Sequence, residues 1–257
     1  MFEGAGKPLS ESGLQQAAGA LGVGLPALWA VMTVETKGCG FLADRRPQIL
    51  FERHVFRKRT QGAFDQTDPD LSNPVAGGYG KGGAFQYERL ARAIALNRSA
   101  ALESCSWGLG QIMGFNAADA GFTDVEAMVT AMCDSEDAQF GAMMSFIRAH
   151  NLAQHLQRND WSNFARQYNG PSFQKNSYDK KLAKAWARFS MGPLPSLRVR
   201  AAQLYLTFVG YNPSGVDGWF GQGTQNALIK FQEAKGLEPS GRLDDPVFLA
   251  LEGAAMG

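Results

Sequence analysis

The sequence predicts a mainly α-helical protein: a large domain over residues 1–191, a linker over 192–196 and a three-helix domain over 197–257. Helical spacing of apolar residues dominates the chain, strand-like alternation is rare, and the Pro-containing segment after Met191 interrupts the helical pattern. At 257 residues a single core is near its practical upper size, so a main domain with a satellite is expected.

Amphipathic segments predict the helices of the large domain. Ser10 can cap a first helix, and Pro26 suits the first turn of a second helix that runs to about Glu35. Segment 48–56 fits either a short strand or a helical turn, and 65–83 is a long polar loop. Further helical patterns cover about 85–97, 124–149, 161–168 and 177–189.

The small domain repeats one turn motif. Pro-Ser-Gly occurs at 213–215 and again at 239–241, and each copy precedes a helical pattern. Three helices are predicted: one over 197–208, one that Thr224 can cap, and one that begins at Asp245.

Composition excludes several classes of partner. Lys and Arg total 25 against 24 Asp and Glu, a net charge of +1, so nucleic-acid binding has no electrostatic basis. Three widely spaced cysteines and three histidines without zincin spacing predict neither a disulfide framework nor a metal site. The Gly-x-Gly-x-x-Gly pattern at 78–83 follows a polar loop instead of a buried strand, which argues against a dinucleotide cofactor. We therefore expect no cofactor. No stretch approaches the roughly 18 apolar residues of a membrane span, so we also expect no membrane insertion.

Carboxylates remain for catalysis, and Glu35 stands out among them. It falls at i+7 from Leu28, on the apolar stripe of the second helix and at its end. Burial and the negative end of the helix dipole would both raise the pKa of this carboxyl. General-acid cleavage of a glycosidic bond requires an acid that is protonated near neutral pH. The alternative is a helix-ending glutamate that points to solvent.

Two further segments offer polar groups for a ligand. In 107–114 a helical spacing places Gln111 between small residues, as an open wall for a polar ligand or as a close helix–helix contact. The helix over 161–168 ends in Tyr168, which either belongs to the core or offers its hydroxyl to a carboxyl.

These segments carry a resemblance to known families. Glu35 before a Gly-rich turn, then GLGQIMG and QYNG, resemble the lysozyme-like and soluble lytic transglycosylase lineage. VETKGCGFLADRRPQILFERHVF with SWGLGQIMGFN resembles phage endolysins of the N-acetylmuramidase family over about 10–190. VDGWFGQGTQNALIKFQEAKGLEPSGRLD resembles the three-helix peptidoglycan-binding module over about 197–253. Both resemblances name bacterial peptidoglycan as the partner.

The resemblance implies a lysozyme-like helical domain that hydrolyses the β-1,4 bond between N-acetylmuramic acid and N-acetylglucosamine for host lysis. Glu35 would be the general acid, and Tyr168 would orient it. The alternatives are a lytic transglycosylase that forms anhydro-muramic products and a non-catalytic wall-binding phage structural protein. The implied substrate-binding residues are Phe41, His54, Gln111, Met113 and Asn169.

The second carboxylate stays open. Glu52 is one candidate, its alternative being an ion pair with Arg53 or Arg57, and Asp44 is another, its alternative being a turn residue. Glu103 precedes the SWGLGQ motif and is a weaker candidate. In the small domain the expected wall-binding residues are Asp217, Trp219 and Phe220, with Trp219 either exposed for sugar stacking or part of the core.

Delivery is also an expectation at this stage. The N-terminus lacks the basic segment and apolar core of a signal peptide. We therefore expect a monomeric enzyme that stays in the host cytoplasm until a holin-type membrane pore releases it to the cell wall.

Overall fold

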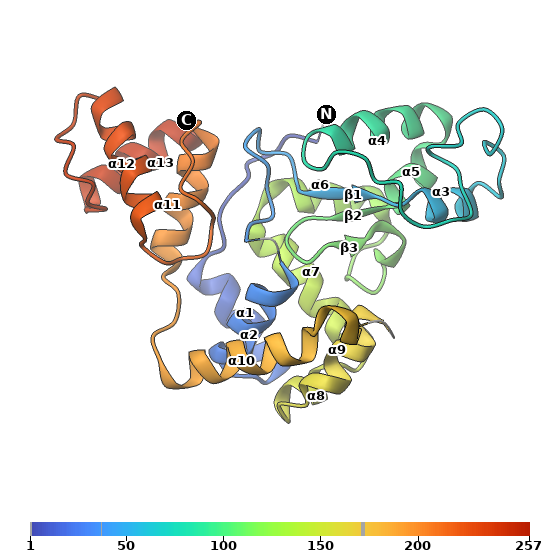
Figure 1. Ribbon diagram of the computed structural model, residues 1–257, viewed down its shortest axis with the longest axis horizontal. Coiled ribbons are helices and arrows are strands. Elements are labelled where there is room, and N and C mark those ends of the chain that lie inside the picture. Colours follow the sequence, from blue (N-terminus) through green and yellow to red (C-terminus); the bar gives the residue numbers. More distant parts are fainter. Residues whose placement is uncertain (1, 37, 171–172) are drawn as a thin grey trace.

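The computed structural model describes residues 2–36, 38–170 and 173–257, and within them it has the expected mainly helical architecture (Figure 1). The large domain combines its helices with a small sheet, and the helices of the C-terminal domain stand apart from it. The large domain contains α1 (Glu11–Leu21), α2 (Leu25–Glu35), α3 (Arg53–Arg59), α4 (Phe85–Leu96), α5 (Arg98–Glu103), α6 (Val125–Asp134), α7 (Glu136–Ala149), α8 (Ala153–Gln157), α9 (Trp161–Asn169) and α10 (Tyr178–Met191).

The first two helices begin where their local signals predict. The Ser10 side chain accepts a hydrogen bond from the Gly13 amide at 3.0 Å and caps α1, and Pro26 lies in the first turn of α2. Helix α2 is buried on nearly all sides from Ala27 to Met32, because it runs between α1 and α10. The catalytic candidate Glu35 therefore ends a helix that is held from two sides.

The predicted helix over 124–149 is two helices. Ser135 separates α6 from α7 in an extended conformation, and its side chain accepts a hydrogen bond from the Ala138 amide to cap α7. The extended backbone at Ser135 pairs with Lys7 of the N-terminal segment, which explains the break.

The sheet has three antiparallel strands in the order β1 (Ile49–Phe51), β2 (Cys105–Trp107) and β3 (Ile112–Met113). Segment 48–56 thus contains both of its alternatives, since β1 is followed directly by α3. The helical interpretation of 107–114 is wrong: this segment is the β2–β3 hairpin, whose turn includes Gly108 and Gln111 at positive φ of 65° and 48°. The β1 edge decides this, because Gly108 donates its backbone hydrogen bond to the Gln48 carbonyl at 2.8 Å.

The small domain consists of α11 (Leu197–Phe208), α12 (Gln222–Ala234) and α13 (Asp245–Met256) around its own apolar core. Asp244 caps α13 through the Val247 amide at 3.0 Å. Thr224 is not the cap of α12, which begins two residues earlier; it is buried and accepts a hydrogen bond from Gln203 Nε2 at 3.0 Å.

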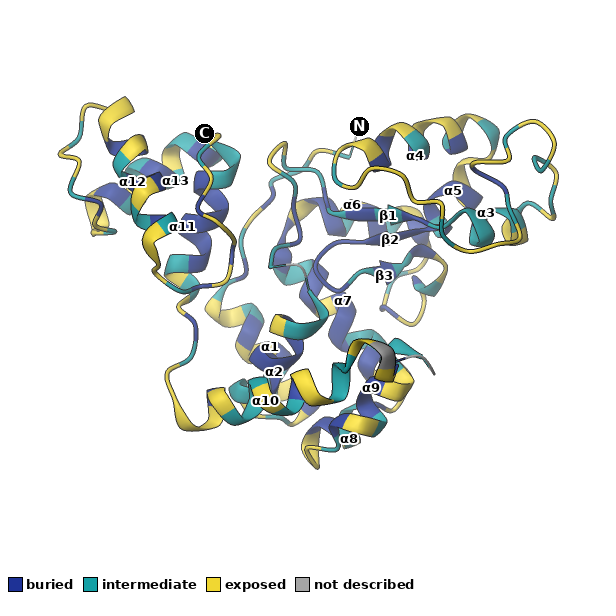
Figure 2. Ribbon diagram, viewed as in Figure 1, coloured by how far each residue is buried: buried dark blue, intermediate teal, exposed yellow. Residues whose placement is uncertain are grey.

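Buried residues form one large cluster in the first domain and a separate smaller one in the second (Figure 2). Phe41, Leu204 and Val216 form a third cluster where the two domains meet. Within the described residues no single helix has the length and apolarity to cross a membrane; α1 and α2 pass such a test only as a pair, bent by 105°.

Candidate active site

Glu35 sits at the C-terminal end of α2, half-buried, beside α9. Asn169 Nδ2 donates a hydrogen bond to Glu35 Oε1 at 2.9 Å. Burial raises the pKa of Glu35 from 4.5 to about 7, while the Asn169 hydrogen bond and the Lys181 charge act in the opposite direction. The carboxyl is therefore partly protonated near neutral pH.

A cleft of about 540 Å³ opens beside this carboxyl. Its walls come from the end of α2, the three-stranded sheet and the α9–α10 region. Glu52, Gln111, Met113, Tyr168 and Asn169, all singled out in the sequence, line it together with Glu35.

Tyr168 touches the opposite wall instead of bonding Glu35. Its hydroxyl donates to the Gly110 carbonyl in the hairpin turn at 3.2 Å, and its ring stacks on Phe164 with centroids 5.4 Å apart. Burial and the nearby Glu35 charge raise the pKa of Tyr168, so the hydroxyl keeps its proton and stays a donor. The direct hydrogen bond to the acid belongs to Asn169, which the resemblance had assigned to substrate binding.

Gln111 shapes the floor of the cleft. Its Nε2 donates to the carbonyls of Gly108 at 2.9 Å and Gln48 at 3.2 Å, and its Oε1 accepts from the Ser106 hydroxyl at 2.9 Å. These bonds engage both ends of the amide within the sheet, so Gln111 holds the hairpin turn in place beneath the cleft.

Glu52 follows β1 and is the second carboxylate of the cleft. The Tyr79 hydroxyl donates to Oε1 at 3.0 Å, and His54 Nδ1 lies 3.1 Å from Oε2. Glu52 Oε2 and His54 Nδ1 are both shielded from solvent, and among the described residues neither atom has a hydrogen-bond partner beyond this ion-pair contact.

The ion pairs predicted between Glu52 and Arg53 or Arg57 do not form. Arg53 donates to the Val75 carbonyl, and Arg57 pairs with Asp65. Sequence reasoning missed Tyr79, which the long 65–83 loop brings to Glu52.

The other candidates of the large domain lie outside the lining of the cleft. Asp44 pairs with Arg46 at 2.6 Å, and Glu103 pairs with Arg59 at 3.0 Å. His54 stands behind Glu52. Phe41 is only 1 % exposed and packs against residues of the small domain, so its place is the domain interface, not the substrate cleft.

The three residues predicted to bind the wall differ in their surroundings. Trp219 is half-buried against the large domain, with the Arg188 guanidinium 4.8 Å from its ring centre. Asp217 Oδ1 accepts from Gln203 Nε2 at 3.0 Å and from the Trp219 amide at 2.9 Å, which fixes the local turn. Phe220 is 45 % exposed and remains free to meet a ligand.

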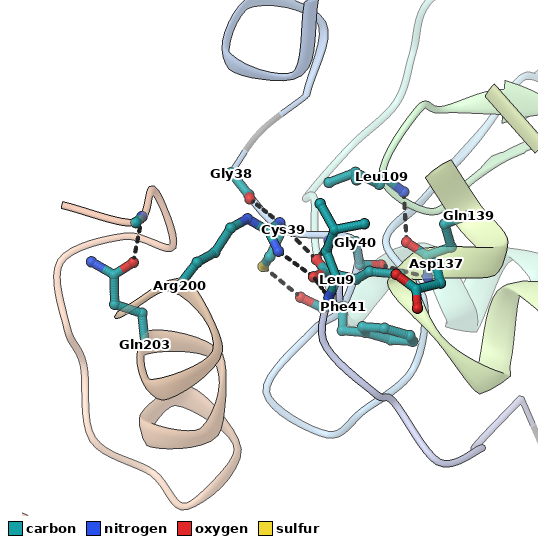
Figure 3. A network of polar contacts seen from close by, with 12 residues as sticks. Leu9, Gly38, Cys39, Gly40, Phe41, Leu109, Asp137, Gln139, Arg200 and Gln203 are labelled. Carbon is teal, nitrogen blue, oxygen red and sulfur yellow. Dashed lines mark hydrogen bonds and ion pairs between the residues drawn. The ribbon is translucent and has the colours of Figure 1, made fainter. Parts of the chain in front are cut away.

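Two buried polar residues of α7 hold the segment after Glu35 and the hairpin turn, and both were missed in the sequence. Gln139 Oε1 accepts from the Leu109 amide in the hairpin turn at 2.8 Å (Figure 3). Glu136 Oε1 accepts from the Gly40 amide at 2.9 Å. Both side chains are fully buried. A signal existed, because they stand at i and i+3 on the face of α7 that also carries Phe140 and Met143.

The described residues contain no cluster of three or more His, Cys, Asp or Glu side chains arranged to hold a metal ion. A helical domain with a cleft, a partly protonated carboxylic acid and a second carboxylate in its lining has the arrangement of a glycoside hydrolase.

Comparisons with known proteins assign the family. The N-acetylmuramidase family model matches residues 24–190, and a peptidoglycan-binding domain model matches residues 196–251. The chain belongs to the N-acetylmuramidase family. It is similar to the crystal structure of the Burkholderia AP3 phage endolysin, at 42% identity and a TM-score of 0.68, over 72% of each chain. A search of curated proteins found no match. The protein is thus a cell-wall-hydrolysing endolysin, a glycoside hydrolase that acts on peptidoglycan.

Proposed function

We propose that Glu35 is the general acid that protonates the leaving oxygen of the β-1,4 bond between N-acetylmuramic acid and N-acetylglucosamine. The observation that supports this role is the pKa of about 7 of a carboxyl that lines the cleft. At that pKa a large share of the enzyme carries the proton at neutral pH, and the leaving oxygen can receive it. Asn169 keeps the carboxyl turned toward the cleft through its hydrogen bond.

Glu52 is the second group in this proposal. It lines the same cleft as Glu35 and would assist the attacking water in a hydrolysis. A second candidate reaction has its own support: both oxygens of Glu52 already have partners in Tyr79 and His54. A lytic transglycosylase needs only one carboxyl, because the sugar's own hydroxyl displaces the leaving group and an anhydro product forms.

The test combines one variant with product analysis. Glu35→Gln keeps the size and the Asn169 contact but removes the transferable proton, so lysis of outer-membrane-permeabilised Gram-negative cells is expected to stop. Glu103→Gln is the matched control, since Glu103 lies outside the lining of the cleft. Wild-type lysis by Glu35→Gln would refute the assigned acid. Mass spectrometry of the wild-type digest then separates the two reactions, because an anhydro-muramic end would exclude hydrolysis.

We further infer a role in host lysis at the end of phage infection. In this setting the monomeric enzyme waits in the host cytoplasm until a holin-type pore opens the membrane, and the small domain then concentrates it on its polymer. Expression with and without a pore-forming protein tests the dependence, and lysis without any pore would contradict it. Size-exclusion chromatography with light scattering tests the monomer.

A further inference from the structure

A buried polar network outside the cleft joins the two domains. Arg200 of α11 forms an ion pair with Glu136 of α7, and both side chains are almost completely removed from solvent, at 2% and 0% exposure. Arg200 Nη2 also donates to the Gly38 carbonyl at 2.7 Å (Figure 3). A side chain of the small domain thus reaches into the large one and meets the chain just beyond Glu35.

Glu136 distributes this contact to backbone on two sides. Its Oε1 accepts from Arg200 Nη2 and from the Gly40 amide, each at 2.9 Å, and its Oε2 accepts from Arg200 Nη1 and from the Leu9 amide. Each carboxylate oxygen therefore has two donors. Removing the guanidinium would leave a buried charge with backbone amides alone.

The segment held by these bonds continues into the last turn of α2. The Gly38 amide donates to Thr36 Oγ1 at 3.3 Å, and that hydroxyl donates to the Met32 carbonyl at 2.6 Å. Gly38 has a φ of +99°, a conformation that suits glycine and fixes the sharp departure from the helix. An unbroken path of hydrogen bonds runs from Arg200 to the turn that carries Glu35.

The opposite wall of the cleft is tied to the same base. Gln139, one turn after Glu136 on α7, accepts from the Leu109 amide at 2.8 Å and donates to the Gly40 carbonyl at 3.4 Å. Gly110, which follows Leu109, accepts a hydrogen bond from the Tyr168 hydroxyl through its carbonyl. The segment after Glu35 and the hairpin turn therefore share one buried support.

We propose that Arg200 is a positioning residue of the active site: the docked small domain fixes the segment after Glu35, and through Glu136 and α7 the cleft wall opposite. The small domain then has two roles, wall binding and completion of the catalytic geometry. This inference rests on the proposed role of Glu35. Since reacting groups must be held to within a fraction of an ångström, loosening this support lowers the turnover number more than substrate affinity.

The test uses short soluble peptidoglycan fragments and the full chain, so that wall tethering contributes nothing to the rate. Arg200→Met is expected to lower kcat by about tenfold or more with little change in KM. In Arg200→Met, water is expected to reach Glu35 past the loosened segment and to lower its pKa, because burial is what raises that pKa. The alkaline limb of the kcat profile therefore moves to lower pH, a change that a smaller folded fraction cannot produce.

Two variants make the test specific. Arg200→Lys keeps the charge but loses the fork that reaches both Glu136 and Gly38, so its kcat and pH limb are expected between those of wild type and Arg200→Met. Arg198→Met is the matched control, since Arg198 lies on the same helix and pairs with the exposed Asp245 inside the small domain. Its kinetics on fragments are expected to equal those of wild type.

The results that overturn the inference are distinct from those that overturn the proposed function. Wild-type kcat and pH profile in folded Arg200→Met would refute the positioning role, and so would a kcat that falls only with the folded fraction while the pH limb stays in place. If Arg200→Met does not fold, wild-type kinetics in Arg200→Lys would refute it equally. Activity of Glu35→Gln on the same fragments would overturn both.

Discussion

Keeping Glu35 protonated near neutral pH has a cost in stability that the structure allows to be calculated. The pKa rises from 4.5 to about 7, mainly because burial disfavours the charged form. At about 1.4 kcal/mol per pKa unit, the free energy of unfolding falls by about 3 kcal/mol when Glu35 ionises. The unfolded chain, with its ordinary pKa, does not carry this loss.

The binding of this proton makes the stability of the protein depend on pH. Between pH 4.5 and about 7 the folded protein holds the Glu35 proton more tightly than the unfolded chain, so stability falls as pH rises through this window. Glu35→Gln has no proton to lose and keeps an oxygen for the Asn169 bond. Its stability is expected to equal that of wild type at pH 4 and to exceed it by about 3 kcal/mol at pH 8.

Thermal unfolding of both proteins from pH 4 to pH 8 measures this difference. For a domain of this size about 3 kcal/mol corresponds to a Tm increase of about 6–12 °C at the alkaline end. Glu103→Gln is the control, because loss of its surface ion pair with Arg59 is expected to lower stability by at most about 1 kcal/mol. A Tm difference between Glu35→Gln and wild type that stays constant with pH would refute the assigned burial of the charge.

Three further predictions test other parts of the molecule. Asn169→Ala removes the donor that lowers the pKa of Glu35, so the alkaline limb of kcat on soluble fragments is expected at higher pH; an unchanged limb would contradict this. Gly40→Ala would make a Cβ clash with Gln139 Oε1, so a destabilisation of about 1–3 kcal/mol is expected in thermal unfolding, and an unchanged Tm would contradict this. Phe220→Ala removes a 45 % exposed ring and is expected to weaken co-sedimentation with purified peptidoglycan by about 1 kcal/mol; equal binding would exclude this residue from the wall contact.

The helices were predictable where their signals are local. The Ser10 cap and Pro26 act within one turn of the residues that they affect, and both helices begin as expected. The break at Ser135 was not predictable, because the apolar spacing continues across it and the partner that extends the backbone is the segment at Lys7. The helical prediction for 107–114 was wrong for the same reason, a partner that is remote in the sequence. Its glycines stand at helical spacing, and the segment forms a hairpin because β1 pairs with β2.

The candidate site divides in a similar way. Glu35 was visible as a carboxylate on an apolar stripe, a contradiction within one helix that the sequence itself displays. The resemblance implied substrate binding by Phe41, and Trp219 was expected either to stack on a sugar or to join the core, but each packs across the domain interface. Periodicity cannot distinguish an aromatic residue that waits for a sugar from one that another domain covers, because the covering residues are remote in the sequence. The role of Arg200 was not predicted either, because its partners Glu136 and Gly38 are remote in the sequence.

The Arg200–Glu136 pair finally allows stability and positioning to be separated. Each single change, Arg200→Met or Glu136→Gln, leaves one buried group without its charged partner and is expected to cost about 3–5 kcal/mol. The double variant carries no buried charge and keeps an amide oxygen for the Gly40 or Leu9 amide, so its loss of stability is expected to be smaller than that of Arg200→Met alone. Its kcat on fragments is nevertheless expected to stay as low as that of Arg200→Met, because the bond to the Gly38 carbonyl is still missing. Recovery of both Tm and kcat in the double variant would mean that the pair serves stability alone.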